Sequence, residues 1–280
     1  GRHAAGLTQI DGYYSDSMDL TNKDHLAFVA RLSLYIRCCA WTALLLFASV
    51  RVAAADVDLA TASSRVSLDT LVSYLEDPGA AMSLAQVQSL PNARWRVQQA
   101  NVPNFGFTRS AYWFRIKLHN SGRSRQERLL EIAYPILDYI DIFQLDGDKL
   151  QQYWQLGDKY PFEQRAFSHR NFVVPIGLDA QSHGEIWIRV LTTSSMQVPL
   201  TLYTSSALAL KDQQESLLFG LYGGVALAML AYNLVLFLGG RDLTYLAYIL
   251  WVANLSTFLA SINGLTFQLL WPHAVSWNDQ

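Results

Sequence analysis

The sequence predicts an antiparallel β-sandwich of the jelly-roll type, followed by two transmembrane helices. Seven short segments between residues 112 and 203 alternate polar with β-branched or aromatic residues, and turn residues separate several of them. No long helical patterns alternate with these segments, which disfavours a Rossmann-like domain. After residue 215 the chain becomes almost entirely apolar.

The N-terminal part predicts export. Residues 1–30 are polar and mildly acidic and receive no role. Arg31 and Arg37 precede the short apolar run 38–50, and three alanines at 53–55 provide small residues for cleavage, so 31–55 is interpreted as a signal peptide. An uncleaved anchor helix is the alternative. Both interpretations place the domain that begins at residue 56 outside the cytoplasm. The two cysteines, Cys38 and Cys39, lie in this segment, so no disulfide is expected in the mature chain.

Residues 56–211 form the predicted exported domain. Leu68, Leu71, Val72 and Leu75 have helical spacing, and a second short helix is expected to start at Ser83, where Gln86 completes a capping box. The expected strands are 112–120, 128–134, 139–145, 150–156, 171–176, 186–192 and 198–203. Turns are expected at 120–122, 146–148 and 182–184.

Two of these strands carry a Trp-x-Arg pair on the face opposite the predicted core. Trp113 with Arg115, and Trp187 with Arg189, are expected to project outward. If the strands are neighbours, these side chains form a surface able to stack on sugar rings or hold an acidic group. Arginine also commonly covers an exposed indole without any ligand, and that interpretation stays open.

The two transmembrane helices are expected at 217–239 and 243–265, because each stretch can cross a hydrocarbon core that takes about 20 helical residues. Residues 266–280 then return to the side of the exported domain. Small residues recur every four positions in the first helix, and two asparagines lie at membrane depth; helix packing is expected at Gly220, Gly224, Ala228, Asn233 and Asn254.

Short motifs in both halves resemble one family. The segment NFGFTRSAYWFR at 104–115 is followed by Tyr-Pro at 134–135, Leu-Asp at 137–138, Gly-Asp at 157–158 and the run 162–165. The membrane half has FGLYGG at 219–224, Tyr-Asn at 232–233, Arg-Asp at 241–242 and Tyr-Leu at 245–246. Over residues 67–272 this chain resembles the bacterial seven-transmembrane receptors with diverse intracellular signalling modules (7TMR-DISM).

The resemblance implies a periplasmic jelly roll similar to carbohydrate-binding modules, seven helices, and a cytoplasmic output such as a diguanylate cyclase, histidine kinase or phosphatase. The chain stops after two helices, so a truncated receptor is expected.

Other chemistry finds little support in the sequence. A formal net charge of −2 lacks the excess of positive charge that is typical of nucleic-acid-binding proteins. Histidine spacing predicts no metal site, no motif implies a cofactor, and no catalytic residue is assigned. A carboxylate pair for glycoside hydrolysis remains a minor alternative, with Asp138, Asp141, Asp158 and Glu163 as its members. Asp158 and Arg165 are expected to pair and order a loop, or to contact a ligand.

The leading functional hypothesis is the input region of a bacterial inner-membrane receptor, with residues 56–211 in the periplasm binding a small, carbohydrate-like ligand. Partners are then this ligand, the lipid bilayer and a second receptor copy or partner receptor. The competing hypothesis is a membrane-tethered module that binds glycan or protein without signalling.

Overall fold

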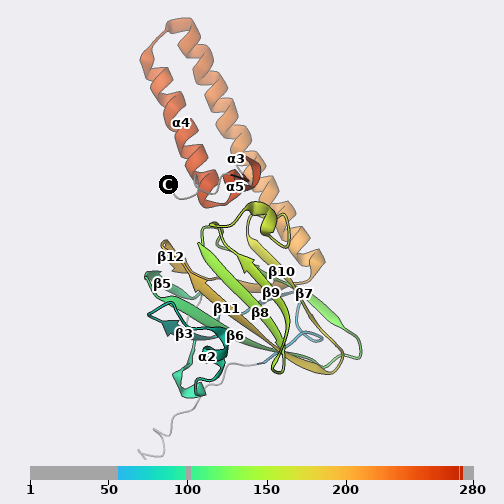
Figure 1. Cartoon of the computed structure of the whole chain (residues 1–280). Helices are drawn as coiled ribbons and strands as arrows, with labels where there is room; N and C mark the ends of the chain where they lie inside the picture. Colours follow the sequence, from blue (N-terminus) through green and yellow to red (C-terminus); the bar gives the residue numbers. More distant parts are fainter. Residues whose placement is uncertain (1–55, 99–101, 271, 274–280) are drawn as a thin grey trace, which may run out of the picture. The chain divides into compact units, whose positions relative to one another are not determined.

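A computed structural model describes residues 56–98, 102–270 and 272–273. The unassigned residues 1–30 and the predicted signal peptide at 31–55 lie outside the described residues. Figure 1 shows the described chain as a β-sandwich from which a helical hairpin continues. The antiparallel sandwich predicted from the alternating segments is confirmed.

The larger sheet follows the order β4-β3-β6-β11-β8-β9, and β1 pairs in parallel with the end of β6. All its other pairs are antiparallel. Its strands are β1 (Val57–Asp58), β3 (Ser73–Asp77), β4 (Arg96–Val97), β6 (Ala111–Asn120), β8 (Tyr139–Asp146), β9 (Lys149–Leu156) and β11 (Ser182–Leu191).

The second layer is a four-stranded antiparallel sheet in the order β10-β7-β13-β2, and a small pair of strands stands beside the sandwich. The four strands are β2 (Arg65–Ser67), β7 (Gln126–Ile132), β10 (Phe172–Leu178) and β13 (Leu200–Tyr203); the pair is β5 (Asn104–Phe107) with β12 (Ser195–Gln197). Strands β9 and β10 are edge strands, one in each layer, and they border one open side of the sandwich.

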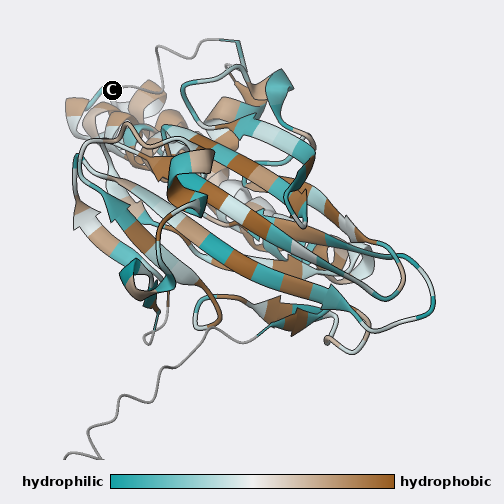
Figure 2. Ribbon diagram, turned by 60° about the horizontal axis from the view of Figure 1, so that its bottom comes forward, coloured by the Kyte–Doolittle hydropathy of each residue, from teal (hydrophilic) through white to brown (hydrophobic). Residues whose placement is uncertain are grey.

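The core lies between the two layers and is built by the residues that the alternation selected. On β6 the side chains of Phe114 and Ile116 are fully buried, and each pairs across to β11, with Ile188 and Ile186 respectively. Because successive side chains of a strand point to opposite faces, the same pairing sends the intervening residues outward. Figure 2 shows the resulting alternation of hydrophobic and hydrophilic residues along the strands.

Two local predictions before and within the sandwich are wrong. The residues at helical spacing, 68–75, form no helix: Leu68 and Val72 are buried in the main core, and β3 then carries Leu75 into a second cluster on the other face. Because these residues are buried in two clusters on opposite faces, their spacing resembles that of an amphipathic helix. The turn expected at 182–184 lies inside β11; the chain reverses before it, where Gln181 has φ 55°.

The second short helix is confirmed as α2 (Leu84–Gln88). Ser83 caps it, and the side chain of Gln86 returns a hydrogen bond of 2.8 Å to the backbone of Ser83. Two short 3₁₀ turns, η1 (Asn92–Arg94) and η2 (Phe162–Gln164), complete the loops.

The membrane half forms α3 (Ser205–Gly240), α4 (Leu243–Ile262) and α5 (Leu265–Leu269). Both α3 and α4 are long and apolar enough to cross a membrane, and almost none of their most apolar stretch is buried. The first predicted span lies within α3, which begins directly after the last strand, so residue 211 falls inside a helix. The second ends at Ile262 rather than 265, because Gly264 takes φ 73° and starts α5. Arg241, with φ 53°, makes the turn between α3 and α4.

The predicted helix-packing residues are only partly engaged by this pair of helices. Apart from the neighbouring residues and backbone of α3 itself, no heavy atom of the described residues lies within 4 Å of a Cβ placed at Gly220 or Gly224, so α4 does not cover that stripe. Asn233 is buried and donates to Met229 O of its own helix, 2.8 Å away. Asn254 is exposed in this pair of helices. A packing role for Gly220, Gly224, Ala228 and Asn254 stays a prediction.

Candidate functional site

The outer face of the larger sheet carries the two Trp-x-Arg pairs, and β6 and β11 are indeed neighbours. Trp187 lies opposite Arg115, and Arg189 opposite Trp113. The expected exposure of the indoles is wrong: Trp113 is 1% exposed and Trp187 is 2% exposed. They belong to a small second core that α2 and the following loop cover, with Trp95 edge-on to Trp187 at 5.3 Å between ring centroids.

The two arginines are held by groups of the protein itself. Arg115 forms a two-pronged ion pair with Glu185, at 2.6 and 3.2 Å, and lies over the Trp187 ring at 5.0 Å. Arg189 contacts Asp141 at 3.3 Å and donates to the backbone of Ala80 at 2.8 Å. This arrangement supports the interpretation that the arginines cover indoles. Ligand contact by Trp113, Arg115, Trp187 and Arg189 stays a prediction. A groove of about 410 Å³ borders Arg115 and Trp187.

Three of the four carboxylates weighed for catalysis have partners within the protein. Asp141 accepts from Tyr153 at 2.7 Å in addition to pairing with Arg189, and Asp138 accepts from the backbone and hydroxyl of Thr193, both at 2.7 Å. Glu163 lies at the exposed surface beside His273. Asp138 and Asp141 are therefore held in place by the protein itself, whereas Glu163 pairs only at the exposed surface.

Asp158 does not form the expected ion pair with Arg165. Instead it lies beside Asp138, because Gly157 packs against the Asp138 backbone so closely that a Cβ at Gly157 would meet the Asp138 carbonyl oxygen at 1.9 Å. Asp158 is 4% exposed, and within the described chain no donor reaches its Oδ1. Burial, and then the charge of Asp138, raise the pKa of Asp158 to about 6.

Arg165 instead lies in an aromatic cage. Its guanidinium stands over the rings of Phe162, Phe172 and Phe267, at 4.7, 4.4 and 5.5 Å from their centroids. It also donates to the carbonyls of His169 and Arg170, at 2.9 and 2.6 Å. Burial lowers its pKa to about 10, which leaves it charged at neutral pH. Since Phe172 belongs to β10 and Phe267 to α5, Arg165 joins the sandwich to the membrane half.

The segment 165–171, which we call the junction loop, also contacts the start of α3. Arg170 forms an ion pair with Glu215 and lies over the Phe219 ring at 4.8 Å. His169 Nε2 lies 3.1 Å from Asp212 Oδ1. The junction loop is thus bound to α3 through ion pairs and to α5 through Arg165.

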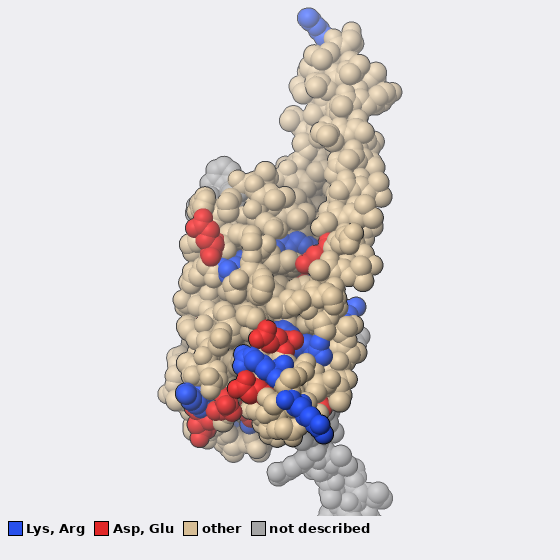
Figure 3. All heavy atoms as spheres, turned by 90° about the vertical axis from the view of Figure 1, so that its right-hand side faces the viewer, with Lys and Arg blue, Asp and Glu red and all other residues tan. Residues whose placement is uncertain are grey.

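A second connection runs from the sheet itself. Lys211 donates to Glu131 of β7 at 2.6 Å and lies 3.4 Å from Glu215. Asn171 donates to the same Glu131 oxygen at 2.7 Å. Burial by itself lowers the pKa of Lys211, but the hydrogen bond and charge of Glu131 and the charge of Glu215 outweigh it and raise the pKa. Figure 3 shows charged atoms where the helices leave the sandwich, and a helical pair without charge until a basic group at its tip.

Close packing fixes the return of the chain at α5. A Cβ at Gly264 would lie 2.8 Å from Pro135 and 3.1 Å from the carbonyl oxygen of Arg170. Phe162 and Phe267 meet edge to face at 5.6 Å. The ends of the helical hairpin, the start of α3 and the segment after α4, therefore both rest on the junction loop.

Sequence reasoning did not identify Glu131, Lys211, His169, Asp212 or Glu215 as a connected group. The only local signal is the spacing of Lys211, Asp212 and Glu215, which puts three charged residues on the last turns before the apolar span. Their partners on β7 and in the junction loop are remote in sequence.

The comparisons with known proteins identify the class of this chain as a membrane receptor region with an extracellular sensor domain. The chain matches the family described as 7TMR-DISM extracellular 2 over residues 69–204, and the region described as 7TM diverse intracellular signalling over residues 215–280. The chain therefore belongs to the 7TMR-DISM family. A search of curated proteins found no match.

Solved structures give distant likenesses to the sandwich. A family 35 carbohydrate binding module from Clostridium thermocellum is 8% identical, with 51% of this chain and 100% of that chain covered and a TM-score of 0.25. CBM35 from Paenibacillus barcinonensis is 11% identical, with the same coverage and TM-score. The GH31 alpha-xylosidase of Xanthomonas citri is 11% identical, with 48% of this chain but only 13% of that chain covered and a TM-score of 0.24.

Proposed function

We propose that this chain is the ligand-sensing input region of a bacterial inner-membrane receptor. The sandwich lies in the periplasm, binds a small, carbohydrate-like ligand, and passes the binding event through the helices to a cytoplasmic output domain. A ligand shifts such a receptor only by binding one arrangement better than the other, so the sandwich needs a mechanical connection to the helices.

The observation that carries this proposal is the junction loop. It joins α3 through Arg170 and His169, and α5 through Arg165. A displacement of this loop therefore acts on both ends of the hairpin together. A flexible linker, as expected for a merely tethered module, transmits no such displacement.

A hydrogen-exchange experiment on the whole chain in lipid nanodiscs tests this connection without a ligand. The variant Glu215→Ala removes the partner of Arg170 on α3. We expect faster exchange of the amides of α5, which shares the junction loop with α3. The control Glu127→Ala removes an exposed carboxylate that pairs with Arg125 on the sandwich. Exchange in α5 that is the same in both variants and in the parent would contradict signalling and favour a tethered binding module.

A further inference from the structure

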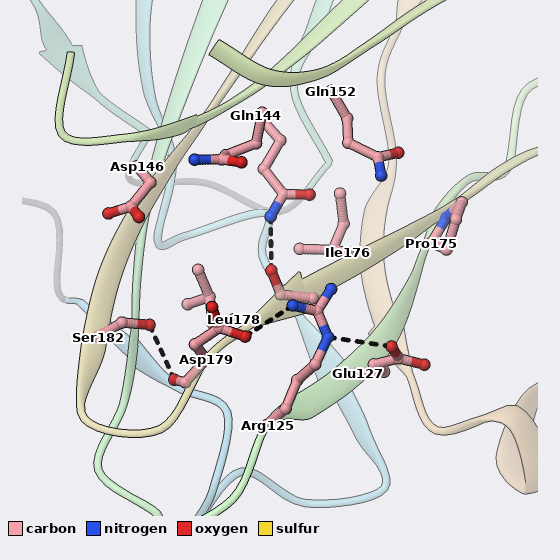
Figure 4. Close-up of a pocket in the computed structure, with 12 residues that line it drawn as sticks. Arg125, Glu127, Gln144, Asp146, Gln152, Pro175, Ile176, Leu178, Asp179 and Ser182 are labelled. Carbon is pink, nitrogen blue, oxygen red and sulfur yellow. Dashed lines mark hydrogen bonds and ion pairs between the residues drawn. The ribbon is translucent and has the colours of Figure 1, made fainter. Parts of the chain in front are cut away.

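A polar cleft of about 250 Å³ lies where the edge strands β9 and β10 border the open side of the sandwich. Figure 4 shows side chains from both layers converging on it: Gln144, Asp146 and Gln152 from the β8–β9 hairpin, and Arg125, Glu127 and Asp179 from the other layer and its loops. It is separate from the outer face and from the junction loop.

Gln144 is the residue that makes this cleft unusual. It occupies an inward-facing position of β8, two residues after the core residue Ile142, and is 6% exposed. Its Nε2 donates to the carbonyl oxygen of Gly177 at 2.6 Å. Because a carbonyl oxygen can only accept, this bond fixes the orientation of the amide and turns Oε1 into the cleft, as Figure 4 shows.

No donor of the described chain reaches Gln144 Oε1. Oε1 is open to the cleft rather than sealed in the core, so its hydrogen-bond donor has to come from the cleft itself. A hydroxyl group of a bound molecule would supply the donor.

The opposite wall is built to keep a guanidinium in place. Arg125 lies flat along Gly177, where a Cβ would stand 2.5 Å from its Nη2. Asp179 accepts a hydrogen bond from Arg125 at 2.7 Å, and Glu127 accepts another from Arg125 at 3.2 Å. Figure 4 shows this group facing Gln144 across the cleft.

The chemistry of the lining selects the ligand. Three carboxylates, Asp146, Asp179 and Glu127, face a single cation, so an anion is disfavoured. Amide and carboxylate groups predominate and no aromatic ring lines the cleft, so hydrogen bonds rather than stacking hold the occupant. Neutral molecules rich in hydroxyl groups, each both a donor and an acceptor, match this lining.

We propose that this cleft binds one neutral sugar unit, with hydroxyl groups that donate to Gln144 and Asp146 and accept from Arg125 and Gln152. The inference rests on the proposed function and names the site and ligand class of the sensor.

The test measures binding of glucose, xylose and cellobiose to the whole chain in nanodiscs by saturation-transfer NMR, with glucuronate and putrescine as an anionic and a cationic probe. Gln152→Ala and Asp146→Asn change exposed side chains and leave the core intact. We expect each to weaken binding of the neutral sugar about tenfold. Gln144→Leu, which keeps the side-chain volume, is expected to abolish binding. The matched control is Lys117→Ala, an exposed residue beside the groove at Arg115.

Unchanged sugar affinity in Gln152→Ala and Asp146→Asn would overturn the site while leaving a sugar receptor in place. Absence of binding by all three neutral sugars, or preference for glucuronate or putrescine, would overturn the ligand class. Neither result affects the exchange experiment at α5, so failure of this inference and failure of the proposed function are distinguishable.

Discussion

Lys211 of α3 donates a hydrogen bond of 2.6 Å to Glu131, a β7 carboxylate that is 1% exposed. The pair joins the helix that enters the membrane to the middle of the smaller sheet. Since Asn171 binds the same oxygen, the carboxylate also fixes the end of the junction loop. Sensor and helix are thus connected by an ion pair with a buried carboxylate as well as by the chain itself.

Replacing Lys211 by methionine leaves the buried Glu131 without its cation. We expect the sandwich to lose about 3 kcal/mol of stability, near the lower limit for breaking a buried pair, because Asn171 still donates. Urea unfolding in nanodiscs, followed by tryptophan fluorescence, measures this. The double variant Lys211→Met with Glu131→Gln is expected to recover part of the loss.

A matched control is Arg125→Met, which removes the cation of two exposed ion pairs. Exposed pairs contribute at most about 1 kcal/mol, so this variant is expected to be close to the parent. Equal losses for Lys211→Met and Arg125→Met would contradict the importance of the buried pair.

Trp187→Ala is expected to destabilise the sandwich by about 3–5 kcal/mol, because it empties a covered cluster rather than an exposed binding face. Thermal unfolding of the chain provides the measurement. Tyr153→Ala, on the exposed edge strand β9, serves as the aromatic control and is expected to cost far less. A stable Trp187→Ala protein would indicate that α2 and its loop do not close over the indole.

Asp158 gives the protein a pH dependence of defined sign. An aspartate has a pKa of about 3.9 in an unfolded chain, and the pKa of Asp158 is raised to about 6 in the folded state. The folded chain therefore binds the proton on Asp158 more tightly than the unfolded chain does. This proton binding stabilises the folded state at low pH, and the stabilisation is lost as the pH rises through 6.

The neutral variant Asp158→Asn is consequently expected to be more stable than the parent at pH 7.5, by roughly 2 kcal/mol. The gain is expected to vanish near pH 4. Unfolding midpoints of both proteins from pH 4 to 8 test this, and a gain or loss that is the same at every pH would refute the assignment to Asp158.

Gly157→Ala is expected to prevent folding of the sandwich. Its φ of 145° disfavours any side chain, and the new Cβ would overlap the carbonyl oxygen of Asp138. Gly147 has φ 57° but open space around it, so Gly147→Ala is expected to cost only about 1–2 kcal/mol. Expression and circular dichroism of the two variants make the comparison, and a folded Gly157→Ala chain would show that this contact is dispensable.

The sequence predicts the parts of this fold that depend on the alternation of side chains along a strand or on the length of an uncharged stretch. Phe114 and Ile186 are predicted in the core because side chains alternate along a strand, and the membrane spans follow from uncharged length. The same period shows which face Trp113 and Trp187 occupy but not what lies on it, so it does not reveal the cover formed by α2. Leu68 and Leu75 imitate a helix since they are buried in different clusters.

The candidate sites depend on contacts that no local pattern records. Glu131 and Lys211 are 80 positions apart, and Gln144 meets Gly177 from the other layer. Asp158 and Arg165 are near in sequence, which favours pairing, yet Gly157 turns the carboxylate toward Asp138. Pairing across layers is set by the tertiary fold, and a single sequence gives only the residue types involved.

Accessibility of single cysteines in whole cells tests the central claim, that the sandwich lies outside the cytoplasm and continues through α3 into the membrane. After Cys38 and Cys39 are replaced by serine, Asp148→Cys marks the β8–β9 turn and Arg241→Cys marks the turn between α3 and α4. We expect a membrane-impermeant maleimide to label residue 148 in cells whose outer membrane alone is permeable, and residue 241 only after the inner membrane is opened. Labelling of both positions from the same side, or of residue 241 first, would contradict the account.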